Sequence, residues 1–452
     1  MTYRLLHKFA SFLHTLLFKF VNFGETEAHE RDKSVAYYLW RFPVLSETFI
    51  QREIVALRNC GLQVTVIATE LGQDNTNDEH FQAFREETLY PNMVEKEARM
   101  RHLRYFFARK PLVSSYMLLY VVSQRYHHKK SLMFDIQTFR TAICLAGALR
   151  DLQINHVHRP WADKNAFVAG VASRLLGISF TAQARAYEIY AKPYKDSIGE
   201  RLAAADLIIT NCNYNQRYLN TILRPTAAPI YTIYEGIDLQ QFDPHDNGVN
   251  KDNRFRILTV ARLVEQKGLI YLLEACGRLR DEGYEFICRI IGGPGHGEDA
   301  QYCDVLMELH SRLRLQGLVE FMGAQPNTVV LNAYRENDLF VLPCVVAADD
   351  SLDITPNVLI EAMAMKLPVI STDLAGIPEM VEAGVNGLLV PPNDVAALTV
   401  TIIRVIKSSE LRKKLGQNAR CTAREKFDIN RNIRQYKRRF MEAHRRIQNV
   451  AS

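Results

Sequence analysis

The chain has 452 residues, of which 48% are hydrophobic and 23% charged, with 56 Lys and Arg against 50 Asp and Glu. This length allows two or three domains, and the composition excludes a disordered tail, a collagen-like repeat and a polytopic membrane protein. The eight cysteines contain no CxxC pair, which indicates reduced thiols in a cytosolic protein.

The N-terminal segment 3–23 is apolar but is interrupted by Arg4, Lys8 and Lys19. These charges argue against a membrane span. The segment also lacks the clear small-residue cleavage site that a signal peptide would have. We expect residues 1–32 to form a basic amphipathic leader on a membrane surface. A helix packed on the protein, or an unstructured leader, is an equal alternative.

Short β-rich runs alternate with helical patterns from about residue 33 to 425, which predicts parallel sheets covered by helices on both faces. A polar, turn-rich stretch at 243–253 divides the runs into two series. The fold class is therefore α/β, with doubly wound domains at 33–222 and 255–425 joined by a linker at 223–254. The expected strands are Val35–Arg41, Gln63–Thr69, His156–His158, Phe180–Arg185, Leu207–Asn211, Ile230–Tyr234, Ile257–Ala261, Phe286–Gly292, Val319–Gly323, Leu339–Pro343, Val369–Thr372 and Gly387–Val390.

Two cations follow the first expected strand of the second domain. Arg262 and Lys267 lie in VARLVEQKG (260–268), where a loop would open onto a cleft at the carboxyl end of the sheet. A guanidinium and an ammonium group suit a diphosphate. The alternative is a pair of solvated loop cations.

The segment DITPNVLIEAMAMKLPVI (353–370) predicts a helix over Val358–Met365, with Thr355 as its N-cap and Pro356 as its first residue. Free amide groups at such an N-terminus favour phosphate binding. Asp353 precedes the helix.

Glu361 interrupts the otherwise apolar helix sequence. It is a candidate acceptor of hydrogen bonds from paired sugar hydroxyls, or else a salt-bridged structural residue. Glu379, in STDLAGIPE, is expected to support the same edge of the domain.

These blocks together resemble the family 4 glycosyltransferases, also called glycosyl transferases group 1, which are retaining enzymes of the GT-B fold with two Rossmann-like domains facing across a cleft. The resemblance covers roughly 35–445 and implies an acceptor-side first domain, a donor-binding second domain and a C-terminal helix, 426–452, that crosses back to the first. It is carried by VARLVEQKG, the D-x7-E spacing in DITPNVLIE, STDLAGIPE, NGLLVPPND, FPVLSETFI (42–50) and YEGIDLQQF (234–242).

The resemblance also implies residue roles. Arg262 and Lys267 would hold the donor diphosphate and stabilise its departure, Asp353 would contact the donor sugar in place of the family's usual Glu, and Glu361 would bind the ribose. The other implied donor-binding residues are Gly293, Thr355, Pro356, Asn357 and Val358. Ser46 and Glu47 would face the acceptor.

One position departs from the family. Where relatives have T-A-H-A-H-D-I-Y, this chain has QARAYEIY (183–190), so that Arg185 replaces a histidine near the reacting sugar. Arginine cannot act as a base near neutral pH, but it can stabilise an anionic leaving group. We interpret the change as altered tuning of catalysis. His156 and His158, at another strand end, are interpreted as structural or peripheral.

The implied reaction is metal-independent hexosyl transfer without a cofactor, from a UDP- or GDP-linked sugar to a glycan or lipid-linked acceptor in polysaccharide, exopolysaccharide or envelope glycan biosynthesis. The departing phosphate is thought to deprotonate the acceptor. Two other hypotheses stay open: a catalytically silent scaffold relative, motivated by Arg185 and Asp353, and a nucleotide-sugar epimerase of the same fold.

Basic charge is concentrated in two segments. Residues 98–130 carry eight Lys and Arg and no acid, and residues 411–446 carry thirteen against three acids. The first segment alternates cations with apolar residues, which predicts peripheral binding to an anionic membrane on its cytoplasmic, inner face; a solvated helix face is the alternative. No motif for nucleic-acid binding is present.

Overall fold

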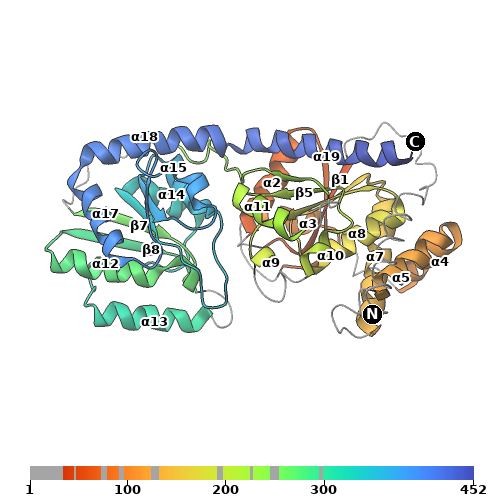
Figure 1. Ribbon diagram of the computed structural model, residues 1–452, viewed down its shortest axis with the longest axis horizontal. Coiled ribbons are helices and arrows are strands. Elements are labelled where there is room, and N and C mark those ends of the chain that lie inside the picture. The colour runs from red at the N-terminus through yellow and green to blue at the C-terminus, as the bar shows by residue number, and fades with distance from the viewer. Residues whose placement is uncertain are drawn as a thin grey trace.

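The computed structural model describes residues 34–44, 47–72, 79–90, 96–123, 132–190, 197–223, 228–244, 254–294 and 299–451. It contains two six-stranded sheets, each parallel throughout and packed between helices (Figure 1). The fold class predicted from the sequence is confirmed. The expected leader at 1–32 and Ser46 lie outside the described residues.

The first sheet has the order β2-β1-β3-β4-β5-β6. Its strands are β1 (Ser34–Phe42), β2 (Gln63–Leu71), β3 (His156–Arg159), β4 (Ser179–Ala184), β5 (Leu207–Thr210) and β6 (Ile230–Thr232). Its helices are α2 (Thr48–Asn59), α3 (Glu79–Glu87), α4 (Lys96–Arg109), α5 (Pro111–Ser123), α7 (Leu132–Asp151), α8 (Lys164–Leu176), α9 (Tyr187–Tyr190), α10 (Ile198–Leu202) and α11 (Asn213–Ile222).

The inner strand β1 shows why the first sheet is packed between two layers of helices. Successive side chains of a strand point to opposite faces, so a continuous apolar run needs a core on each side. Ala36 and Tyr38 pack into one core, while Tyr37 and Leu39 pack into the core on the other face.

The second sheet has the order β12-β11-β10-β7-β8-β9. All twelve expected strands are present, and their ends differ from the expected ones by at most two residues. The strands are β7 (Phe255–Val260), β8 (Phe286–Ile291), β9 (Val319–Phe321), β10 (Leu339–Leu342), β11 (Val369–Thr372) and β12 (Leu388–Val390). The helices are α12 (Leu269–Asp281), α13 (Asp299–Arg312), α14 (Asn327–Glu336), α15 (Asn357–Ala364), α16 (Ile377–Met380), α17 (Val395–Lys407) and α18 (Ser409–Lys426).

The chain crosses between the domains twice, and the two crossings are hydrogen-bonded to each other. The Ile237 amide donates to the Phe427 carbonyl (2.9 Å), and the Ile429 amide donates to the Ile237 carbonyl (3.0 Å). Gly236 is required here, because a Cβ at this position would lie 2.5 Å from the Cα of Ile429. The two paired backbone segments, around Ile237 and around Ile429, are called the hinge.

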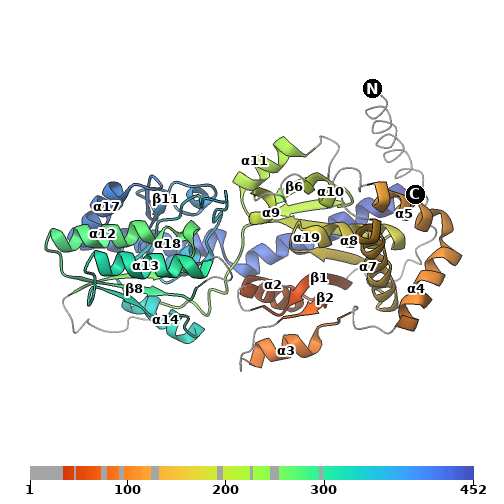
Figure 2. The same cartoon turned by 90° about the horizontal axis from the view of Figure 1, so that it is seen from below.

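Beyond the hinge, helix α19 (Ile429–Ala451) lies along the first domain (Figures 1 and 2). Its apolar side chains recur every three or four residues and enter the core shared by β1 and α2; they are Ile429, Ile433, Tyr436, Phe440 and Ala443. Its arginines at 431, 434, 438 and 445 are exposed. Among the described helices, none combines the length and the apolar character that crossing a bilayer requires.

His156 and His158 lie beneath α19. The His156 ring is 4.7 Å from the Phe440 ring, and its nitrogens are 2.8 and 2.9 Å from the hydroxyls of Ser179 and Thr181. Burial lowers the pKa of His156 to about 3 and that of His158 well below its usual value. Both imidazoles are therefore neutral core residues at physiological pH.

Candidate functional site

The loop after β7 places Arg262 and Lys267 at the carboxyl end of the second sheet. Gly268 closes this loop at φ 65°, and a Cβ there would lie 1.9 Å from the carbonyl oxygen of Pro343 at the end of β10. Only glycine allows this approach, which fixes the loop against the neighbouring strand. The Leu263 amide donates to the Gly293 carbonyl (2.9 Å), so that Gly293 lies beside the same loop.

The two cations differ in their surroundings. Lys267 forms a short ion pair with Asp353, and their side chains are 13% and 21% exposed. Burial lowers the pKa of Lys267, but the Asp353 carboxylate outweighs this effect and holds the pKa above its usual value. Arg262 is exposed, and its side chain has no hydrogen-bond partner among the described residues. One cation is thus held in place by a carboxylate, and the other is available to a ligand.

Helix α15 points its N-terminus toward the first domain. The helix begins at Asn357, and Pro356 precedes it with ψ at 112°, so the expectation that Thr355 caps the helix and Pro356 is its first residue is wrong. The Thr355 hydroxyl instead accepts a hydrogen bond from the Asn211 amide group of the first domain (2.8 Å). The first backbone amides of α15, including that of Val358, lack partners within the helix and can receive an anion.

Glu361 lies one turn further along α15. Its Oε2 accepts a hydrogen bond from the Tyr334 hydroxyl (3.1 Å), and its Oε1 lies 3.4 Å from the Arg52 guanidinium of α2. The carboxylate is therefore oriented from both domains. Arg52 was not found from the sequence, because nothing in the sequence around residue 52 indicates a partner in the other domain.

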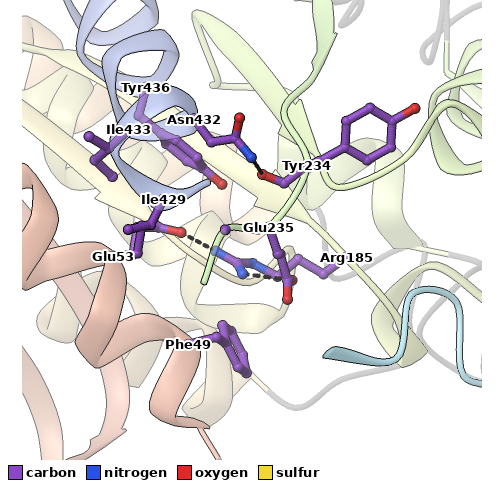
Figure 3. Close-up of a pocket in the computed structure, with 10 residues that line it drawn as sticks. Phe49, Glu53, Arg185, Tyr234, Glu235, Ile429, Asn432, Ile433 and Tyr436 are labelled. Atoms are coloured by element: carbon purple, nitrogen blue, oxygen red, sulfur yellow. Dashed lines mark hydrogen bonds and ion pairs between the residues drawn. The ribbon is translucent and has the colours of Figure 1, made fainter. Parts of the chain in front are cut away.

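Arg185 occupies the centre of a charged network between the domains (Figure 3). Its guanidinium donates to Glu53 (2.8 Å), Glu235 (2.9 Å) and Gln183 (2.6 Å), and it lies 4.8 Å from the centre of the Phe49 ring. Two carboxylates thus balance its charge inside the protein. The expectation that Arg185 stabilises an anionic leaving group stays a prediction.

Glu235 connects this network to helix α15. Besides Arg185, its carboxylate accepts a hydrogen bond from the Asn357 side chain (2.7 Å), at the first residue of α15. The cavity around the network is small, about 20 Å³, which is room for about one water molecule. The segment YEGIDLQQF, which contains Glu235, resembles the family. The link that Glu235 forms between Arg185 and Asn357 was not predicted from the sequence.

Glu47 directly precedes α2 and follows Ser46 in the sequence. Burial raises the pKa of Glu47 to about 7, even though Arg159 and Arg185 act to lower it. Glu47 is therefore a carboxyl group that can change its charge near neutral pH.

Glu379 fastens the two domains together at the other side of the site. Its carboxylate accepts hydrogen bonds from the backbone amides of Asn213 (2.8 Å) and Tyr214 (2.6 Å) at the N-terminus of α11, and from the Tyr234 hydroxyl (2.8 Å). An acid at a helix N-terminus stabilises that helix, and here it does so across the domain boundary.

The structure thus gathers Gly293, Arg262, Lys267, Asp353, Asn357 and Glu361 along one edge of the second sheet and links Arg185 to that edge through Glu235. Within the described part of the chain, no group of three or more His, Cys, Asp or Glu side chains is placed to hold a metal ion.

Part of the chain matches a known protein family, and the chain as a whole is similar to known proteins. Residues 241–422 match the family model described as glycosyl transferases group 1. The chain is 28% identical over 385 residues to WcaL of Escherichia coli (strain K12), a protein named for a glycosyltransferase role in colanic acid biosynthesis; the match covers 80% of this chain and 88% of WcaL.

A second relative and a solved structure add to this. Over 153 residues the chain is 38% identical to the amylovoran biosynthesis glycosyltransferase AmsK of Erwinia amylovora, covering 33% of this chain and 35% of AmsK. The crystal structure of Anabaena Alr3699/HepE in complex with UDP has a TM-score of 0.67 at 18% identity, covering 91% of this chain and all of that one. The structural likeness shows that the fold is shared.

Proposed function

We propose that the chain is a group 1 glycosyltransferase that transfers a hexosyl group from a nucleotide sugar to a glycan or lipid-linked acceptor, with retention of anomeric configuration. The proposal is supported by the family-model match over residues 241–422 and by the fold that the chain shares with HepE. The names of the relatives WcaL and AmsK support a place in exopolysaccharide biosynthesis. The donor carries uridine or guanosine diphosphate; HepE, which has the same fold, binds UDP.

The observation that carries this proposal is the convergence of two cations, a helix N-terminus and two carboxylates on one edge of the second sheet. In the proposed complex, Arg262, Lys267 and the first amides of α15 bind the diphosphate. Glu361 accepts hydrogen bonds from the ribose diol, and Asp353 faces the donor sugar. Gly293, Thr355, Pro356 and Asn357 line the same pocket.

The proposed step breaks the bond between the anomeric carbon and the donor phosphate oxygen, and the electron pair leaves with the phosphate. Arg262 and Lys267 neutralise the charge that develops there, in the place a metal ion takes in other enzymes. The acceptor oxygen forms a new bond to the anomeric carbon on the face from which the phosphate leaves, and its proton passes to the phosphate. Ser46 and Glu47 hold the acceptor, and Arg185 orders the region of the reacting carbon through Glu235.

The shorter acid at position 353 does not by itself favour a catalytically silent relative. Asp353 reaches Lys267 with its ordinary side-chain length and forms the ion pair that fixes the cation. The ion pair supports the proposal that both residues belong to the donor site.

We also propose that the first domain docks on the inner, cytoplasmic face of a membrane through α4 and α5. These helices lie at the end of the molecule remote from the second domain (Figures 1 and 2). On α4, Arg101 and Arg104 are exposed, while on α5 Leu112 and Leu119 are 84% and 68% exposed. Exposed cations can bind anionic lipid headgroups, and exposed leucines can enter the apolar part of the bilayer, so the two helices together suit an anionic lipid surface.

The proposed activity is tested by measuring both nucleoside diphosphate release and conversion of the donor sugar, for UDP-, GDP- and ADP-sugars with and without lipid-linked or glycan acceptors. A transferase releases nucleotide in an acceptor-dependent manner. Conversion of donor without acceptor would indicate an epimerase, and no turnover with any pair would indicate a scaffold.

A further inference from the structure

Helix α2 of the first domain reaches α15 of the second by two routes that begin at adjacent residues. Arg52 contacts Glu361 directly, with 3.4 Å between guanidinium and carboxylate. Glu53 is linked to α15 by a chain of hydrogen bonds through Arg185, Glu235 and Asn357. The direct route ends on the carboxylate to which the proposed function assigns the ribose.

The Arg52–Glu361 contact has the features of a replaceable interaction. The two side chains are 18% and 16% exposed, and the distance is long for a charge-assisted hydrogen bond. The Nε of Arg52 is buried and has no partner among the described residues. The guanidinium is thus placed at the carboxylate by packing, without the bidentate geometry of a strong pair.

The opposite oxygen of Glu361 is held differently. The hydroxyl of Tyr334, which is fully buried, donates to Oε2 at 3.1 Å. A ligand that needs the Glu361 carboxylate can therefore leave the Tyr334 contact intact and displace only Arg52 from Oε1.

We propose that Arg52 is a positioning residue of the donor site that pairs with Glu361 and yields this carboxylate to the ribose diol of the nucleotide. Donor binding then breaks an ion pair between the two domains, so the affinity for nucleotide and the relation between the domains are coupled. By linkage, the Arg52–Glu361 contact weakens nucleotide binding by the same factor by which bound nucleotide weakens the contact. This inference rests on the proposed function.

The test is isothermal titration of the full chain with the nucleoside diphosphate that wild type binds. Arg52→Gln removes the competing cation and should tighten nucleotide binding about two- to fivefold, the factor that a partly exposed ion pair contributes. Arg52→Met keeps the aliphatic stem and should give the same gain, which guards against loss of packing. Arg52→Lys keeps the charge and should bind as wild type does.

Arg58 supplies the matched control. It lies on the same helix and pairs with Glu87 at 2.8 Å within the first domain, so Arg58→Gln should leave nucleotide affinity unchanged. In a Glu361→Gln background, Arg52→Gln should have no further effect, because the two changes act through one contact.

Unchanged or weaker nucleotide binding in both Arg52→Gln and Arg52→Met would overturn the inference while leaving the donor site itself in place. If wild type binds none of UDP, GDP and ADP, the proposed function fails and the inference falls with it.

Discussion

Arg185 and Glu53, 132 positions apart in the chain, form a buried ion pair of 2.8 Å beneath the hinge. The second carboxylate on Arg185, that of Glu235, lies on the segment that crosses into the second domain. Arg185 is therefore part of the support between the domains, and the effects of its substitution follow from this arrangement.

Replacing Arg185 by histidine should destabilise the protein strongly. A neutral imidazole would leave Glu53 and Glu235 as buried carboxylates without a countercharge, a loss on the order of 3–5 kcal/mol. Urea unfolding of Arg185→His against wild type measures this. The control is Arg41→Gln, because the side chains of the Arg41–Glu70 pair are 40% and 46% exposed and its loss should cost less than about 1 kcal/mol. A variant that keeps wild-type stability but loses turnover would instead assign Arg185 a direct catalytic role.

The strands, and the meeting of the residues that follow them, could be predicted because both depend on local patterns. Apolar runs bounded by turns gave all twelve strands, and parallel strands bring their carboxyl ends to one edge, so Lys267 and Asp353 meet although 86 positions separate them. What sequence reasoning missed depends on the docking of the domains. Thr355 has the residue type of a helix cap, but its hydroxyl bonds to Asn211 of the other domain.

The same reason explains Arg52, which meets Glu361 across 309 positions. No periodicity links two residues on separate folding units, and a surface arginine on a helix is ordinary in composition. Such contacts become visible only once the relative placement of the domains is known.

Lys267→Ala should lower turnover by about 10²–10³-fold, the loss seen when one group that stabilises developing negative charge is removed. Nucleotide release under saturating donor measures the effect. Arg404→Ala removes an exposed cation of α17 in the same domain and should change nothing. A loss confined to folding stability would contradict a role for Lys267 at the diphosphate.

Glu47 should make stability depend on pH between the ordinary pKa of glutamate and about 7. In this range the native state keeps a proton that the unfolded chain has released, so stability falls as pH rises. Glu47→Gln should therefore melt about 2–6 °C above wild type at pH 8 and equal it at pH 4, as differential scanning calorimetry can measure. Parallel curves for the two proteins would show that Glu47 is not buried as described.

Membrane docking through α4 and α5 should depend on both charge and apolar surface. The double variant Arg101→Gln/Arg104→Gln should weaken binding to phosphatidylglycerol-containing vesicles about tenfold or more, because each cation contributes about 1 kcal/mol. Sedimentation with vesicles measures this, and Leu112→Gln/Leu119→Gln should also reduce binding.

The basic face of α18 provides the comparison. Lys413→Gln/Lys414→Gln removes the same charge from exposed positions elsewhere. Equal losses in the two double variants, or equal binding of wild type to pure phosphatidylcholine vesicles, would argue against a specific docking surface on α4 and α5.

A donor site built around Glu361 is tested most directly by the thermal shift of wild type and Glu361→Ala with UDP, GDP and ADP. Glu336→Ala, which removes an exposed acid of the same domain, is the control. A ligand at about 100 times its Kd adds roughly 2.7 kcal/mol of stability. We expect one nucleotide to raise the melting temperature of wild type and Glu336→Ala by a few degrees and to leave Glu361→Ala unshifted. Equal shifts in all three proteins, or none in wild type, would contradict a donor site built around Glu361.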